Sequence, residues 1–150
     1  MCGIIGAASS RNVGKLLVQG LHKMEYRGYD SAGIALHQKD SIFKLRTLGK
    51  VGLLEDGMIE QRPKSKLGIA HTRWATHGPP SEQNAHPHSS SGEVYIVHNG
   101  IIENYLELTA KLTKAGYAFQ SETDSEVIAH LLHQHFQASG DLLEAMHDAI

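Results

Sequence analysis

The stretch MCGIIGAA at residues 1–8 places the only cysteine of the chain, Cys2, directly before an apolar run. We predict that residues 3–8 form a short buried strand. An initiator methionine is generally removed when a small residue follows, and removal of Met1 would leave Cys2 with both a thiol and a free α-amine. An adjacent base activates a nucleophile by taking its proton, directly or through a water. The alternative is that Cys2 is a small buried hydrophobic residue at the start of a strand.

The length and composition of the chain exclude several classes of protein. With 150 residues we expect one domain, residues 1–150, which is large enough for a hydrophobic core. The net charge of −2 favours neither nucleic acid nor a membrane surface as a partner, and no apolar run approaches the ~20 residues of a membrane span. A single cysteine excludes an internal disulfide framework, and no basic signal segment precedes Cys2. These features indicate a reducing, cytoplasmic compartment.

Periodicity and turn signals predict a mixture of strands and helices along the rest of the chain. The order of these elements favours an α/β or α+β layered domain, with residues 72–92 as a long loop. The last helix has no stop signal before Ile150, which we interpret as a chain cut from a longer one. The expected strands are residues 34–37, 42–48, 67–71, 93–98 and 117–119, and the expected helices are residues 13–24, 51–58, 105–112, 123–136 and 141–150.

Two local patterns near the C-terminus lead to specific expectations. Thr123 and Glu126 have the spacing of a capping box, in which each side chain bonds a backbone N–H at the start of a helix. His130, His133 and His135 lie mostly off the apolar stripe of the same helix. We therefore expect these histidines on a solvated face.

The dipeptide Asn99-Gly100 follows an apolar strand and is a candidate for charge stabilisation. Attack of a thiolate on an amide carbonyl generates an oxyanion, which needs hydrogen-bond donors aimed at it. An asparagine side-chain amide and a glycine backbone N–H can form such a pair. Because Asn-Gly is also the commonest hairpin turn, a purely structural role stays open.

Two charged side chains could bind the ends of a free amino acid. Arg73 stands beside the only tryptophan, Trp74, so that a guanidinium could bind a carboxylate while the indole covers the pocket. The alternative is an Arg–Trp stack on the surface. A carboxylate at Asp124 could bind an ammonium group, and its alternative role is to cap a helix.

The histidine content, eleven residues, raises the alternative of a metal site formed by His71, His77, His86, His88 and His98. The chain offers no cysteine partners for such a site and no HExxH spacing. Hydrogen-bonded structural histidines are therefore the favoured interpretation.

Five blocks taken together resemble the class II glutamine amidotransferases, which are N-terminal nucleophile hydrolases. Within that family they resemble the glutaminase domain of the glutamine–fructose-6-phosphate aminotransferases, also called glucosamine-6-phosphate synthases. The blocks occur in register from Cys2 to about Leu132, cover nearly the whole chain and are highly specific as a set. They are the opening MCGIIG, EYRGYDSAGIA at 25–35, GIAHTRWATHGPPSEQNAHPH at 68–88, VHNGIIEN at 97–104 and SETDSEVIAHL at 121–131.

The resemblance implies a role for each matched residue. Cys2, freed of Met1, would attack the side-chain amide of L-glutamine, with its own α-amine as the base. Asn99 and Gly100 would form the oxyanion hole. The remaining matched residues would bind the substrate: Arg73 its α-carboxylate, Asp124 its α-amino group, Thr76 and His77 as pocket walls, Trp74 in a mobile loop over the pocket, and Arg27 near the nucleophile.

The resemblance also implies the architecture and the partners. The expected fold is an α+β, four-layer αββα sandwich that is incomplete on its C-terminal side, because the family's glutaminase domain continues beyond residue 150 and the synthase domain is absent. Missing strands would leave a sheet edge and apolar helix faces exposed. Ammonia would pass to a sugar-phosphate isomerase domain that binds fructose 6-phosphate, for the synthesis of glucosamine 6-phosphate. No metal or organic cofactor is expected, and a homodimer is a possible assembly.

Two hypotheses of other classes stay open beside this one. The unstopped helix at Ile150 motivates a truncated chain that binds glutamine or a partner without turnover. The histidines motivate a metal-binding module.

Overall fold

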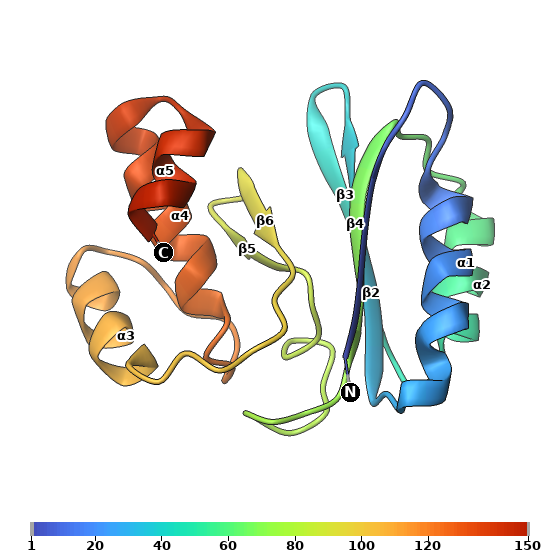
Figure 1. The fold of residues 1–150 in the computed structure, drawn as a ribbon, viewed down its shortest axis with the longest axis horizontal. Helices are drawn as coiled ribbons and strands as arrows, with labels where there is room; N and C mark the ends of the chain where they lie inside the picture. Colours follow the sequence, from blue (N-terminus) through green and yellow to red (C-terminus); the bar gives the residue numbers. More distant parts are fainter. Residues whose placement is uncertain (1, 150) are drawn as a thin grey trace.

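The computed structural model describes residues 2–149, so the expected loss of Met1 and the unstopped end at Ile150 concern residues outside the described part. Helices and strands are distributed along the whole described chain (Figure 1). In order they are β1 (Gly3–Ala8), α1 (Gly14–Met24), a 3-10 turn (Glu25–Arg27), β2 (Ser31–Gln38), β3 (Ser41–Leu48), α2 (Val51–Gln61), β4 (Leu67–Arg73), β5 (His88–Ser90), β6 (Val94–Ile96), α3 (Tyr105–Lys114), α4 (Glu126–Ser139) and α5 (Leu142–Ala149).

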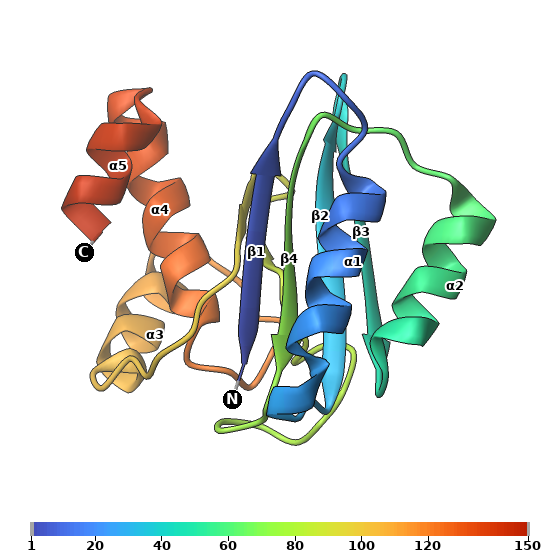
Figure 2. The same cartoon turned by 45° about the vertical axis from the view of Figure 1, so that its right-hand side comes forward.

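The elements form four successive layers. Helices α1 and α2 cover one face of a sheet made of β1 to β4, the pair β5–β6 lies on the other side of that sheet, and α3 to α5 lie beyond the pair (Figures 1 and 2). We call β1–β4 with α1 and α2 the N-terminal half, and β5, β6 and α3–α5 the C-terminal half. The α-β-β-α succession is the predicted one.

The larger sheet is antiparallel throughout, in the order β1-β4-β2-β3. In the register of β1 with β4, Gly3 lies opposite Thr72, and the backbone N–H of Gly3 donates to Thr72 Oγ1 at 3.1 Å. A Cβ at position 3 would lie 2.8 Å from that oxygen, so the close approach requires glycine. The register places Cys2 beside the residues that follow Thr72.

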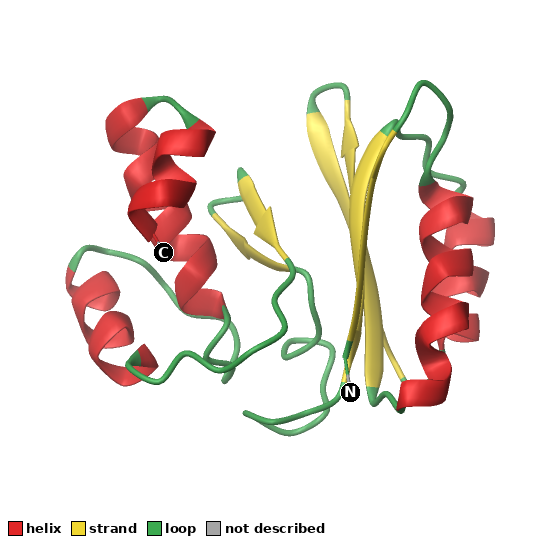
Figure 3. Ribbon diagram, in the orientation of Figure 1, coloured by secondary structure: helices red, strands yellow, loops and turns green. Residues whose placement is uncertain are grey.

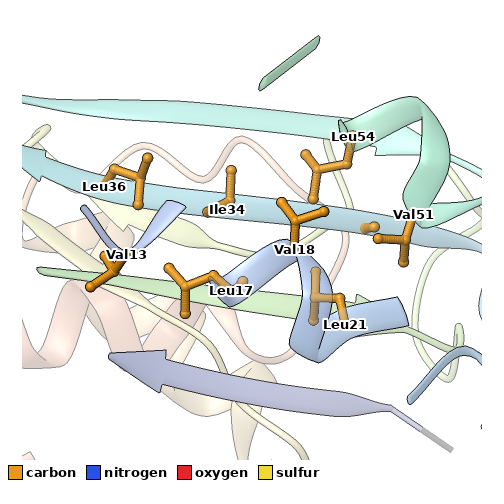
Figure 4. Close-up of a cluster of buried hydrophobic side chains, with 10 residues drawn as sticks. Val13, Leu17, Val18, Leu21, Ile34, Leu36, Val51 and Leu54 are labelled. Carbon is orange, nitrogen blue, oxygen red and sulfur yellow. The ribbon is translucent and has the colours of Figure 1, made fainter. Parts of the chain in front are cut away.

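An apolar core holds the two N-terminal helices against the sheet (Figure 4). Helix α1 supplies a buried stripe at helical spacing, in which Val18 is buried and Leu16, expected in the stripe from the sequence, is exposed. The sheet and α2 supply the opposing side chains. The fully or almost fully buried members labelled in Figure 4 are Val13, Leu17, Val18, Leu21, Ile34, Leu36, Val51 and Leu54.

The C-terminal half has a smaller apolar cluster and a more polar interior. Strands β5 and β6 pair antiparallel, with His88 opposite Ile96, and pack against α4. The buried apolar residues of this cluster are Val94, Ile96, Ala129 and Leu132. Around it lie buried polar side chains that bond one another, such as His130 Nδ1 with Ser90 Oγ at 2.8 Å.

Three expectations for the C-terminal half were wrong. Residues 88–90 form β5 instead of continuing the loop, while residues 117–119 form no strand. The capping box is absent because α4 begins only at Glu126, and Glu126 instead accepts hydrogen bonds from the backbone N–H groups of Gln120 and Ser121. Thr123 Oγ1 bonds His88 Nε2 at 3.0 Å.

The prediction that the histidines of α4 lie on a solvated face was also wrong. His130 is buried, with its ring 4.6 Å from that of Phe119, and His133 Nδ1 bonds the Tyr117 hydroxyl at 2.9 Å. The apolar run 117–119 therefore packs on this helix and does not pair with a strand.

Within residues 2–149, no helix combines the length and the apolar character needed to cross a bilayer.

Candidate active site

A cavity of about 400 Å³ opens where the two halves meet, at the end of the larger sheet that carries Cys2. Figure 3 shows the long loop after β4 passing this end of the sheet, beside the N-terminus. Every residue proposed from the sequence as a site residue lines this cavity: Cys2, Arg27, Arg73, Trp74, Thr76, His77, Asn99, Gly100 and Asp124. The volume falls within the range of small-molecule sites.

Cys2 is held at the entrance of the cavity by the loop that follows β4. The backbone N–H of Trp74 donates to Cys2 Sγ at 3.2 Å, and the thiol faces the Trp74 carbonyl at 3.6 Å. The side chain is half-buried, so the purely hydrophobic role considered above does not describe it. The sulfur is accessible from the cavity and already accepts a hydrogen bond, as a thiolate would.

Asn99 connects Cys2 to the buried wall of the cavity. Its Nδ2 donates to the Cys2 carbonyl at 3.3 Å, and its Oδ1 faces His71 Nε2 at 2.8 Å. Residues 99 and 100 form no hairpin turn, since β6 ends at Ile96 and α3 follows. A Cβ at Gly100 would lie 2.7 Å from His98 Nε2, so glycine allows the backbone to lie against that ring. His98 Nδ1 in turn bonds Ser125 Oγ at 3.0 Å.

Arg73 is buried and organises the loop around the cavity. Its guanidinium donates to the carbonyls of His77, of Gly78 at 3.2 Å and of Pro79 at 3.4 Å. Asp30 Oδ1 lies 3.8 Å from Nη1, and Asp30 Oδ2 accepts a hydrogen bond from the backbone N–H of Ala75. The guanidinium has five N–H donors, and these partners can take at most four of them. At least one N–H group and the positive charge are left for a ligand.

Trp74 and its neighbours form the outer wall. The indole is about half exposed and packs on Gly28, where a Cβ would lie 2.3 Å from its Cζ3. Gly28 also has φ of +85°, a conformation that favours glycine. The ring of His77 meets the edge of Tyr105 at 5.5 Å. Arg27 lies on the same side, with its guanidinium 5.7 Å from the ring of Tyr26.

Asp124 is a buried carboxylate that lines the cavity and lies between α3 and α4 in the chain. Its Oδ2 accepts a hydrogen bond from the backbone N–H of Ile102 at 2.8 Å, and its Oδ1 lies 3.9 Å from His77 Nδ1. It is 3% exposed and, among the described residues, has no Lys or Arg within ion-pair distance. Asp124 precedes α4 and does not cap it with its side chain. A cationic ligand group would supply the missing counter-charge.

A row of buried imidazoles packs at the floor, where His71 and His86 line the cavity and His88 lies behind them. The ring of His71 lies 4.2 Å from that of His86, which lies 4.4 Å from that of His88. Burial lowers the pKa of His71 to about 4 and that of His88 to about 3, and it holds the pKa of His86 well below the usual value. The floor is therefore uncharged at neutral pH. Within residues 2–149 no cluster of histidine, cysteine and carboxylate side chains is placed to hold a metal ion.

Sequence reasoning assigned no role in glutamine hydrolysis to three residues that organise this cavity, although His71 was considered there as a metal ligand. Asp30 fixes the loop after β4, His71 contacts Asn99, and Asn84 links the two sides of the cavity. Asn84 Nδ2 donates to the carbonyl of Pro79 at 2.9 Å, and its Oδ1 accepts from the backbone N–H of Glu122 at 2.9 Å. These contacts join residues far apart in sequence, so no local spacing pattern marks them.

Comparisons with known proteins agree with this geometry. The sequence profile of the glutamine amidotransferase domain family matches residues 71–147. The chain is 56% identical over 150 residues to a glutamine–fructose-6-phosphate aminotransferase (isomerizing) of Legionella pneumophila strain Paris, covering 99% of this chain and 25% of the relative. It is 54% identical over 151 residues to the protein of that name from Pseudomonas aeruginosa, covering 100% and 25%. The chain thus spans about a quarter of the length of these curated relatives.

Solved structures show the same fold. A glutamine phosphoribosylpyrophosphate amidotransferase from B. subtilis, complexed with ADP and GMP, superposes with a TM-score of 0.79 at 24% identity, covering 99% of this chain and 32% of that one. A structure described as the allosteric regulatory enzyme of purine biosynthesis gives 0.81 at 25% identity, with the same coverage. These likenesses confirm the predicted α+β fold class of the N-terminal nucleophile amidotransferases. With the profile match over more than half of its length, the chain belongs to the glutamine amidotransferase domain family.

Proposed function

We propose that this chain hydrolyses the side-chain amide of L-glutamine and delivers the ammonia to a sugar-phosphate isomerase domain that binds fructose 6-phosphate. The observation that carries the hydrolysis is that Cys2, Asn99 and Arg73 line one cavity together with Asp124, a buried carboxylate that has no Lys or Arg partner among the described residues. The acceptor domain is proposed from the names and lengths of the curated relatives.

In the proposed reaction, Cys2 Sγ forms a bond to the amide carbon while its proton passes to the α-amine that loss of Met1 exposes. The oxyanion accepts hydrogen bonds from Asn99 Nδ2 and the Gly100 N–H, the kind of preorganised donors that lower such barriers. The carbon–nitrogen bond then breaks. The protonated α-amine of Cys2 gives its proton to the leaving nitrogen, which departs as ammonia. Water hydrolyses the thioester by the same route and releases glutamate.

Substrate orientation follows from the two charges. Arg73 would bind the α-carboxylate with the donor capacity that its bonds to the loop 77–79 leave, and Asp124 would bind the α-ammonium group. Thr76 and His77 line the space between them, Trp74 covers it, and Arg27 lies on the same outer wall. Burial of both charges makes each ion pair stronger than on a surface, since water competes less.

The test is release of glutamate from glutamine by the purified chain, after intact-mass measurement has shown that Met1 is absent. We expect turnover from the wild type and none from Cys2→Ala, which should also lose labelling by a glutamine-mimicking electrophile. A folded, Met-free sample that binds glutamine in calorimetry without releasing glutamate would establish the alternative of a binding fragment. Activity that survives in Cys2→Ala would point to another nucleophile.

A further inference from the structure

The side-chain amide of Asn99 has two ends of nearly the same shape and opposite hydrogen-bonding character. Only the Nδ2 end can donate to an oxyanion, whereas the Oδ1 end would repel it. In the structure Nδ2 lies 3.3 Å from the carbonyl of Cys2 and Oδ1 lies 2.8 Å from His71 Nε2. Asn99 itself is exposed and lies outside any strand or helix, so these two contacts must select the orientation, and the one to His71 is the shorter and the more buried.

His71 has the chemistry to make that selection. Asn99 Oδ1 can only accept, so the proton of the neutral imidazole must be on Nε2. Burial, which lowers the pKa of His71 to about 4, keeps the ring neutral at neutral pH, with one N–H to donate. Nδ1 is buried and has no hydrogen-bond partner among the described residues, and the ring bonds the backbone of His98 as well as the Asn99 amide.

His71 is also held more firmly than the residue it contacts. It lies inside β4, is 1% exposed, and packs at a tilt against His86, whose ring meets that of His88 edge to face. His88 Nε2 bonds Thr123 Oγ1 at 3.0 Å, which anchors the far end of the row. The donor that faces Asn99 is therefore fixed by the core of the molecule.

We infer that His71 is a positioning residue: through Nε2–H it holds the Asn99 amide so that Nδ2, and not Oδ1, faces the nucleophile. This inference rests on the proposed function, because it assigns Asn99 as an oxyanion donor. His71 touches no reacting atom in this assignment and acts only through Asn99.

The expected magnitude follows from counting orientations. Without the bond, Asn99 has about three χ1 wells and two amide orientations, of which one is productive. Loss of His71 Nε2–H should therefore reduce kcat by at most about sixfold. Removal of the donor itself, as in Asn99→Ala, should cost about 10²–10³. KM should change little, because the oxyanion forms only after binding.

The experiment compares His71→Gln with His71→Asn in the full chain. The Nε2 of glutamine reaches the position of the imidazole Nε2, whereas the shorter asparagine places its donor near the Nδ1 position. We expect His71→Asn to lose up to about sixfold in kcat and His71→Gln to recover most of that loss. Both substitutions introduce a polar amide at the same buried site, so equal damage from the two would overturn the assignment.

A double-mutant cycle removes the structural explanation. In an Asn99→Ala background, His71→Asn should cause no further fall in kcat, because no amide remains to be oriented. A fall that multiplies with that of Asn99→Ala would show that His71 acts elsewhere. Alkylation of Cys2 by iodoacetamide needs no oxyanion hole, and its rate should be the same in all variants.

The inference and the proposed function fail in different ways. If the wild type releases no glutamate, the function fails, and the side-chain amide resonances of Asn99 still test the contact. A shift and broadening of these NMR signals in His71→Asn but not in His71→Gln would support it. Unchanged Asn99 signals in His71→Asn would refute it.

Discussion

The two halves of the molecule are stabilised by different interactions. The N-terminal half packs α1 and α2 on a four-stranded sheet through aliphatic side chains such as Leu17, Ile34 and Leu54, all fully buried. The C-terminal half instead buries polar side chains beside a small apolar cluster. Each bonds another polar side chain or nearby backbone, and they include His88, Ser90, Glu126 and His130. The cavity takes its sulfur from the first half and its carboxylate from the second. The apolar half thus carries the proposed nucleophile, and the polar half carries buried charge and hydrogen bonds.

The largest effect on stability should come from truncation of the apolar half. Leu17→Ala removes a fully buried side chain in the centre of the α1 stripe and should lower the free energy of unfolding by about 2–5 kcal/mol. Leu16→Ala, on the exposed side of the same helix at 55% exposure, should cost less than about 0.5 kcal/mol. Urea titration followed by circular dichroism measures both, and similar losses in the two variants would contradict the assigned core.

The next effect tests charge in the polar half. Asp124→Asn keeps an acceptor for the Ile102 N–H but removes the negative charge at the cavity. Because a hydrogen bond to a charged group is worth about 1.5–3 kcal/mol, we expect KM for glutamine to rise by about 10- to 100-fold. The melting temperature should stay close to that of the wild type. A KM within twofold of wild type would remove Asp124 from the substrate site.

Acid should destabilise the buried imidazoles of His71 in β4 and His88 in β5, which pack together across the two halves through His86, by an amount of similar size. The pKa of His71 is about 4 and that of His88 about 3 in the folded chain, below the usual 6.5. The unfolded chain therefore binds more protons below pH 6.5, so stability is complete above that pH and is lost as pH falls toward 4. At pH 5 each ring should cost about 2 kcal/mol.

Thermal melts at pH 7 and pH 5 measure this loss. His88→Asn should reduce the difference between the two pH values, whereas His147→Asn, whose side chain is 90% exposed, should leave it unchanged. Glu126 does not obscure the window: burial raises its pKa, but hydrogen bonds from His130, Ser121 and the backbone outweigh that and bring it to about 2. Equal stability at both pH values would show that the rings protonate freely in the folded state.

The smallest effect concerns the last helix of the polar half. Asp141 Oδ1 accepts hydrogen bonds from the backbone N–H groups of Leu143 at 2.8 Å and Glu144 at 3.2 Å, as an N-cap does. Asp141→Ala should cost about 1 kcal/mol and should speed amide exchange in α5. Asp141→Ser keeps a capping oxygen and should restore most of the protection. Exchange in α1 should not change in either variant.

The N-terminal half could be predicted from the sequence better than the C-terminal half, and the reason is physical. The strand at Gly3–Ala8 is marked by an apolar run, the hairpin of β2 and β3 by apolar residues around a polar turn, and α1 by buried residues at helical spacing. In the C-terminal half the three-residue strand His88–Ser90 has no apolar pattern, because its side chains are buried by hydrogen bonding. Likewise nothing in the spacing of His130 shows that Ser90, forty residues earlier, is its partner.

Candidate site residues divide in the same way. Cys2, Arg73, Asn99 and Asp124 could be found because their motifs are specific, and the structure places all of them on one cavity. Their roles remain predictions. Asp30, His71 and Asn84 could not be found from local patterns, since each acts through a contact with a distant segment.

The antiparallel pairing of Gly3 with Thr72 has a consequence for transplanting this chemistry. Cys2 immediately precedes one member of that pair, and Arg73 and Trp74 immediately follow the other, so the ladder of β1 and β4 sets the distance from the sulfur to the loop. Strand residues advance by about 3.3 Å and alternate between faces. Inserting one residue between Cys2 and Gly3 would carry the thiol away from the cavity. Transfer of the proposed nucleophile to another protein would therefore require both strands with their pairing intact.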